Sequence, residues 1–185
     1  MIIAGLDPSL QNFGMSKGVL CEDTGTFNLT HLRLQTTEPS KAKTQRKSHD
    51  DFNRATTLRK AMFDFISDVD LVMAEVPIGS QSARASVSYG ISVGLLAAIQ
   101  KPLIQVNPTE VKLAATGNKT ATKAEMISWA IETYPDADWL TKKRKGELQF
   151  THANEHLADS VAVIHAGVKS ETFQQLLAFQ RKVSP

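Results

Sequence analysis

The hydrophobic pattern of the first 36 residues predicts three consecutive strands. The apolar run MIIAGLD ends at Asp7, and a turn separates it from a second extended segment over 14–20. A further turn over 22–25 precedes residues 26–36, in which apolar and polar side chains loosely alternate. Strands joined this closely in sequence are expected to pair as an antiparallel meander.

The rest of the chain combines helical periodicity with two short apolar runs, 71–74 and 102–106, which predict buried parallel strands. Helices are predicted over 51–66, 82–99, 108–115, 123–134, 154–168 and 171–182. Asp50 or Asp51 is the expected cap of the first of these helices. Three antiparallel strands followed by two strands between helices predict an α/β domain with a mixed five-stranded sheet and helices on its faces.

Two basic segments interrupt this pattern. Residues 37–50 contain almost no apolar side chain and predict a mobile loop. Residues 135–150 form a basic insertion that contains the sequence KKRK. No internal repeat, low-complexity stretch or linker divides the chain, so we expect one domain over 1–185 that ends in a C-terminal helix within 171–185.

Composition narrows the class of protein. A chain of 185 residues with 42% apolar content buries about 70% of its unfolded surface, so a bound metal is expected to serve function rather than folding. The single cysteine, Cys21, excludes an intramolecular disulfide and a cysteine-rich zinc module. No apolar run approaches the ~18 residues that span a bilayer. We therefore expect a cytoplasmic protein without a membrane partner.

Acidic and imidazole groups supply the candidate chemistry. Asp7 and Glu75 end apolar strands, where a carboxylate is costly to desolvate unless it is hydrogen-bonded or metal-bound. On the helix over 154–168, His156 and Asp159 share a face, and so do Glu155 and Asp159, so spacing alone does not choose between them. Each group alone could mark an ordinary strand end or solvated helix face. Together, carboxylates from two strand ends and a late helix are the hard oxygen ligands that Mg²⁺ prefers, with one nitrogen ligand as an option.

Such a cluster can hold two metal ions about 4 Å apart across a phosphodiester, without a protein nucleophile. Basic residues flank it in two regions, 33–60 and 112–145. Lysines beside an acidic site suit a phosphate backbone, although a solvated surface is the plain alternative. The bases expected to contact DNA are Lys41, Lys43, Arg46, Lys47, Lys119, Lys142, Lys143, Arg144 and Lys145.

The segment GLDPSLQNFGMS resembles the opening motif of RuvC-type Holliday junction resolvases, nucleases of the RNase H-like superfamily. The likeness extends through most of the chain up to Val168. It includes the segments AEVP (74–77), the helix over 82–94, PTEVK (108–112) with ATG (115–117), ATK (121–123) and HLADS (156–160). The order and spacing of these segments carry the resemblance, since no single one is specific.

The resemblance implies an RNase H-like fold and a homodimer that cuts two strands of a four-way junction symmetrically. It implies two Mg²⁺ ions per active site, with Mn²⁺ able to substitute. The metal ligands at matching positions are Asp7, Glu75, His156 and Asp159, with His156 where relatives have aspartate or histidine. Lys112 and Lys123 match lysines near the scissile phosphate or the DNA backbone. Ile78 falls where relatives place a large apolar or aromatic side chain against junction bases.

The basic loop around 41–47 and the insertion over 135–149 depart from the bacterial pattern and resemble a divergent, phage-encoded member. We therefore predict a Mg²⁺-dependent, structure-selective DNA endonuclease that resolves Holliday junctions by paired symmetric cuts. One alternative is a broader nuclease that acts on flaps, branches or RNA–DNA hybrids. Another is a nucleic-acid-binding module with a retired active site.

Overall fold

A five-stranded sheet with strand order β3-β2-β1-β4-β5 forms the centre of the computed structural model, which describes residues 1–79 and 82–183. Its strands are β1 (Ile2–Asp7), β2 (Asn12–Leu20), β3 (Phe27–Thr36), β4 (Leu71–Glu75) and β5 (Leu103–Val106). The first three pair antiparallel, β4 runs parallel to β1, and β5 runs parallel to β4. The predicted α/β class and mixed five-stranded sheet, three antiparallel strands followed by two parallel ones, are confirmed.

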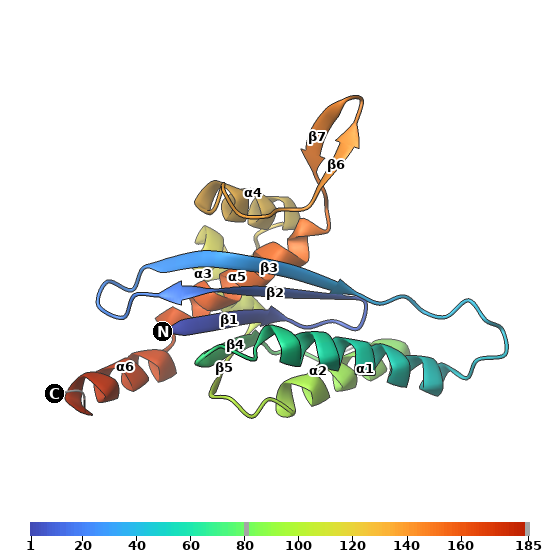
Figure 1. The fold of residues 1–185 in the computed structure, drawn as a ribbon, viewed down its shortest axis with the longest axis horizontal. Coiled ribbons are helices and arrows are strands. Elements are labelled where there is room, and N and C mark those ends of the chain that lie inside the picture. The colour runs from blue at the N-terminus through green and yellow to red at the C-terminus, as the bar shows by residue number, and fades with distance from the viewer. Residues whose placement is uncertain (80–81, 184–185) are drawn as a thin grey trace.

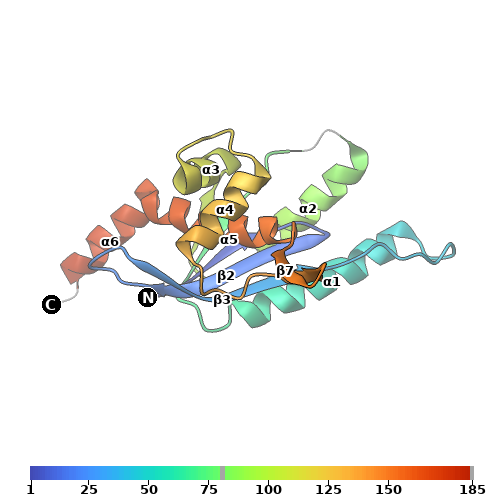
Figure 2. The ribbon, with the colours of Figure 1, turned by 90° about the horizontal axis from the view of Figure 1, so that it is seen from above.

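Helices flank both faces of this sheet (Figures 1 and 2). They are α1 (Lys47–Phe65), α2 (Ala83–Ala97), α3 (Pro108–Thr116), α4 (Lys123–Thr133), α5 (Asn154–Lys169) and α6 (Glu171–Val183). One apolar core joins α1 and α2 to one face, and a second joins α3, α4, α5 and α6 to the other. Among the described residues, no helix is long and apolar enough to cross a membrane.

Side-chain alternation along the central strands decides which face the acids occupy. In β1, Leu6 packs in the core beneath α1, whereas Ile3 packs in the core beneath α5. Because alternate strand residues share a face, Asp7 lies on the α5 side. In β4, Met73 packs on the α5 side, which places Glu75 there as well. Both carboxylates therefore end adjacent parallel strands on the face covered by α5.

Two glycines let α5 lie directly on the sheet. A Cβ at Gly14 would collide with the backbone carbonyl of His156, and one at Gly5 would collide with the carbonyl of Ser160. Gly14 is also the β2 residue paired with Asp7. The absence of side chains at these positions therefore brings the first turns of α5 close to the end of β1.

The start of α1 differs from the prediction. The helix begins at Lys47, and its N-cap, Arg46, makes no side-chain capping bond. Asp50 already lies in the first helical turn, and Asp51 binds Arg84 of α2 instead of capping a helix. The expected cap is wrong, because α1 starts without a sequence signal. Each other predicted helix or strand begins and ends within two residues of its expected bounds.

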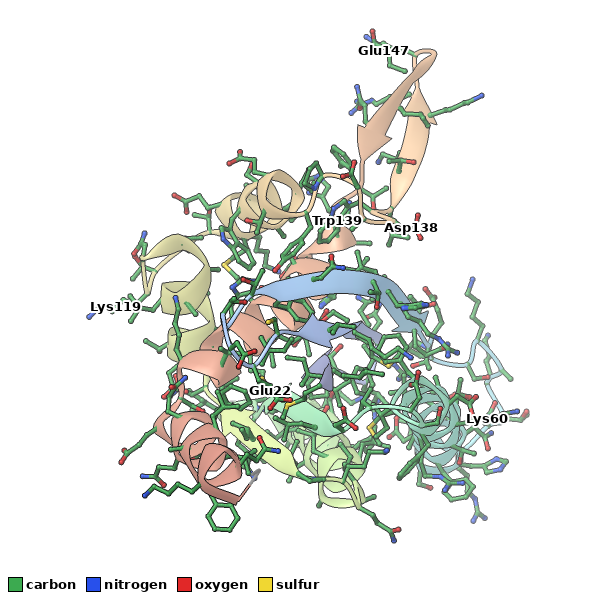
Figure 3. All side chains as sticks on the ribbon, turned by 60° about the vertical axis from the view of Figure 1, so that its left-hand side comes forward. Glu22, Lys60, Lys119, Asp138, Trp139 and Glu147 are labelled. Carbon is green, nitrogen blue, oxygen red and sulfur yellow. The ribbon has the colours of Figure 1, made fainter. Side chains whose placement is uncertain are left out.

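The basic insertion contains a hairpin for which we predicted no strands. β6 (Thr141–Arg144) and β7 (Glu147–Phe150) pair antiparallel and project beyond α4 (Figure 1). Lys145 and Gly146 connect them with φ values of 52° and 88°, the positive values that a two-residue type I′ turn requires at both positions. Figure 3 shows Glu147 at the far end of this hairpin and Trp139 near its base.

Candidate active site

β1, β4 and α5 bring the four predicted site residues into electrostatic contact. His156 Nδ1 lies 3.1 Å from Asp7 Oδ2. The charge of Asp7 raises the pKa of Glu75, and the charges of Asp7 and Glu75 both raise the pKa of Asp159. Charges separated by up to 152 positions in sequence therefore interact at one end of the sheet. The sequence suggested this for Asp7 and Glu75, because each ends one of two strands that pair in parallel.

Burial is the first cause of the acidic shifts. It raises the pKa of Asp7, against the opposing hydrogen bond and charge of His156. Burial and then the charge of Asp7 raise the pKa of Glu75 to about 7. Burial and then three neighbouring carboxylates raise the pKa of Asp159 to about 8. The hydrogen bond to Asp7 raises the pKa of His156. The ionised carboxylates are therefore destabilised by burial and by one another. Such raised pKa values are typical of functional sites.

Glu155 and His156 point to different partners. Glu155 Oε1 lies 2.7 Å from Lys123 Nζ, whereas His156 contacts Asp7. The Lys123 side chain is 78% exposed, so its ammonium group remains accessible to solvent at the edge of the site. The geometry places His156, rather than Glu155, beside the strand-end carboxylate.

Lys112 approaches the same cluster from α3. Its side chain is partly buried, and its charge lowers the pKa of Glu75 against the effect of burial. Lys112 therefore lies near the end of β4, where its ammonium group acts on Glu75. The two predicted catalytic lysines thus reach the site from neighbouring helices, α3 and α4.

The acids do not form a ready-made coordination shell. Within residues 1–79 and 82–183, no three or more His, Cys, Asp or Glu side chains are arranged to hold one metal ion. The three carboxylates at this end of the sheet are nonetheless the oxygen donors that suit a hard divalent cation, and the imidazole of His156 adds one softer donor. Metal binding at these residues would require side chains to rotate, including the carboxylate of Asp7 that now faces His156.

The predicted DNA-contacting side chains lie on separate segments. Ile78 is 74% exposed in the loop after β4. The exposed bases comprise Lys41, Lys43 and Arg46 before α1, Lys47 at its start, Lys119 between α3 and α4, and Lys142, Lys143, Arg144 and Lys145 on the hairpin. Lys119 extends outward from its loop (Figure 3).

Arg54, in the basic region 33–60, stabilises the fold and is not exposed to solvent. Arg54 is buried, and its guanidinium donates to the backbone carbonyl of Leu10 and to the hydroxyl and carbonyl of Thr37. These bonds fix the turn that follows Asp7. Nothing in the sequence distinguishes Arg54 from its solvated neighbours, because the Leu10 and Thr37 groups that it binds are distant along the chain.

Asn154 is a second positioning residue that the sequence did not reveal. It is fully buried, and its side-chain amide pairs with both the backbone N–H and the carbonyl of Leu140. This pair ties the base of the β6–β7 hairpin to the first residue of α5. Because His156 follows Asn154 by two residues, the same pair of hydrogen bonds positions both the hairpin and the start of the helix that carries His156.

The fold of this chain is similar to that of RuvC. The structure of Thermus thermophilus RuvC superposes with a TM-score of 0.63, at 18% identity over 96% of this chain and 97% of that chain. T. thermophilus RuvC in complex with Holliday junction substrate gives a TM-score of 0.62, at 18% identity over 96% of both chains. No protein-family model and no curated protein sequence matches the chain.

Proposed function

We propose that this protein is a metal-dependent endodeoxyribonuclease that resolves four-way DNA junctions. The observation that carries the proposal is the convergence of Asp7, Glu75 and Asp159, with His156, at one end of a RuvC-type sheet. A module that only bound DNA would gain nothing from three partly buried acids facing a polyanion. The acidic cluster therefore favours catalysis over the retired-site alternative.

The electrostatics of the cluster support Mg²⁺ or Mn²⁺ as its cofactor. Mutual repulsion contributes to the raised pKa values of Glu75 and Asp159, and a divalent cation would offset that repulsion. We assign Asp7, Glu75, His156 and Asp159 as ligands. Two bound ions would supply an activated water and stabilise the leaving oxygen.

The remaining residues of the site act on the substrate phosphate and on the ligands. His156 donates a hydrogen bond to Asp7 and holds its carboxylate in place before metal enters. Lys112, beside Glu75, neutralises the phosphate that approaches the cluster. Lys123 can exchange its exposed ion pair with Glu155 for a backbone phosphate, since surface ion pairs contribute only about 0–1 kcal/mol.

Resolution of a junction requires two symmetry-related cuts, so we propose a homodimer. A four-way junction is pseudo-symmetric, and a two-fold dimer presents two equivalent active sites to it. In this proposal the exposed bases before α1, between α3 and α4, and on the hairpin bind the arms, and Ile78 contacts bases near the branch.

A substrate panel tests this function. Four-way junctions, flaps, RNA–DNA hybrids and linear duplex are incubated with the protein and Mg²⁺ or Mn²⁺, and the products are mapped on each strand. The proposal predicts paired, symmetric cuts in the four-way junction and little cleavage of linear duplex. Equal cleavage of flaps and junctions would instead support the broader nuclease, and binding without cleavage at any metal concentration would support the binding module.

A further inference from the structure

The β6–β7 hairpin exposes an apolar pair that no other part of the described chain covers. Leu148 and Phe150 are 68% and 53% exposed, and both lie in β7, two residues apart, so they share a face. Thr141 lies opposite Phe150, and Lys143 lies opposite Leu148. A two-stranded ribbon without a covered face is only marginally stable in water, so this face is suited to a partner.

The base of this ribbon is firmly attached to the helix that carries the active site. The Asn154 amide binds both backbone groups of Leu140 at 2.8 and 2.9 Å, and the N–H of Thr151 donates to the Leu140 carbonyl. Buried Trp139 donates its indole N–H to the carbonyl of Tyr134. The ribbon therefore projects from a fixed base that lies two residues before His156 along the chain.

The charge of the ribbon identifies the chemistry of the partner. Between residues 141 and 150 the bases are Lys142, Lys143, Arg144 and Lys145, and the single acid is Glu147. Four cations beside two exposed apolar side chains suit a nucleic acid, with phosphates facing the cations and base or sugar surfaces facing the apolar pair. A two-stranded ribbon also matches the width of a DNA major groove, about 12 Å.

We infer that this ribbon is a branch-reading element, in which Leu148 and Phe150 pack against bases left unstacked at the junction centre while the four cations hold the adjoining phosphates. The inference rests on the proposed junction-resolving function and adds a structural reason for preferring branched to linear DNA. Linear duplex offers phosphates but no unstacked base faces, so the apolar pair would contribute to binding only at a branch.

A second copy of the chain is the competing occupant. A two-fold contact through the apolar face would place Lys143 of one copy near Lys143 of the other, with the remaining cations of both ribbons close behind, because a symmetric interface repeats the same patch. Such a contact is unfavourable without an anion between the ribbons. The charge pattern therefore favours DNA.

The test separates DNA binding from cleavage. In an Asp7→Asn background without divalent metal, the double variant Leu148→Ser/Phe150→Ser is compared with Phe179→Ser, which removes another exposed phenylalanine, from α6. Fluorescence anisotropy measures affinity for a four-way junction and for a linear duplex of the same sequence. We expect about tenfold weaker junction binding by the double variant and about unchanged duplex binding, since base stacking is the interaction removed. Phe179→Ser should match the background on both DNAs.

Two further variants resolve the other outcomes. A Phe150→Trp variant should bind the junction about as tightly as the background protein and more tightly than a Phe150→Ser variant, because tryptophan keeps an aromatic surface at this position. Replacing the four cations with glutamine should weaken binding to both DNAs and flatten the salt dependence, by up to about 0.9 in slope for each phosphate that the ribbon no longer neutralises.

Unchanged junction affinity in the double variant, or equal losses on junction and duplex, would overturn the inference. So would dissociation of a dimer on sedimentation, which would assign the apolar face to a second copy. Because affinity is measured without catalysis, a wild-type protein that bound junctions through the ribbon but cut no DNA would contradict only the proposed function.

Discussion

Removing one carboxylate from the acidic cluster should stabilise the metal-free protein, in a manner that depends on pH. The pKa of Asp159 rises from 3.8 to about 8. Because the folded-state pKa lies above the unfolded one, the folded protein retains a proton that the unfolded chain has released between these values. The Asp159 contribution to the free energy of unfolding therefore falls as pH rises from about 4 to about 8.

The magnitude follows from the same shift. At about 1.4 kcal/mol for each pKa unit, the rise from 3.8 to about 8 sets an upper bound of about 6 kcal/mol. Asp159 is partly exposed, so water screens part of this cost. We expect Asp159→Asn to raise the free energy of unfolding by about 2–4 kcal/mol at about pH 8, and by almost nothing at about pH 4.

Denaturant unfolding of wild type and Asp159→Asn in a metal chelator, across a pH series, measures this difference. Asp136→Asn, at an exposed position in the loop after α4, provides the matched control and should show no comparable pH-dependent gain. A gain that is the same at both ends of the series, or a loss of stability at about pH 8, would refute the claim that Asp159 is held among repelling carboxylates.

Three further substitutions test the supports of the site. Gly14→Ala should destabilise the protein and displace His156, because the added Cβ would collide with the carbonyl of His156. The control Gly90→Ala, in open space on α2, should be neutral or stabilising by about 1 kcal/mol. Thermal unfolding compares the two variants. Arg54→Met should cost about 1–3 kcal/mol in denaturant unfolding, because it leaves the Thr37 carbonyl without its donor and removes one of the two donors to the Leu10 carbonyl. Asn154→Ala should accelerate proteolytic cleavage within the hairpin while cleavage elsewhere is unchanged.

Much of the site could be predicted because chain topology decides it. Asp7 and Glu75 each follow an apolar strand, and parallel pairing of β1 with β4 brings the two strand ends together. The three-residue spacing of His156 and Asp159 put both on one face of a helix that packs on that sheet. Alternation within the strands then directed both carboxylates toward this helix.

Features that depend on distant partners could not be predicted. In the sequence, Arg54 is indistinguishable from the other basic residues of region 33–60. Only folding brings the carbonyls of Leu10 and Thr37 within hydrogen-bonding distance of it. Asn154 lacks a distinguishing pattern because its partner is the backbone of Leu140. The β6–β7 hairpin lacks the buried, alternating face by which strands are recognised, since all of its residues are exposed.

Cleavage of a four-way junction by wild type and by Asp7→Asn, with junction affinity measured in parallel, tests the central claim most directly. We predict that wild type cuts the junction only when Mg²⁺ or Mn²⁺ is present. Asp7→Asn should cut at no detectable rate while binding the junction as tightly or more tightly, because one negative charge facing the phosphates is gone. Cleavage by Asp7→Asn at the wild-type rate, or metal-independent cleavage by wild type, would contradict the account.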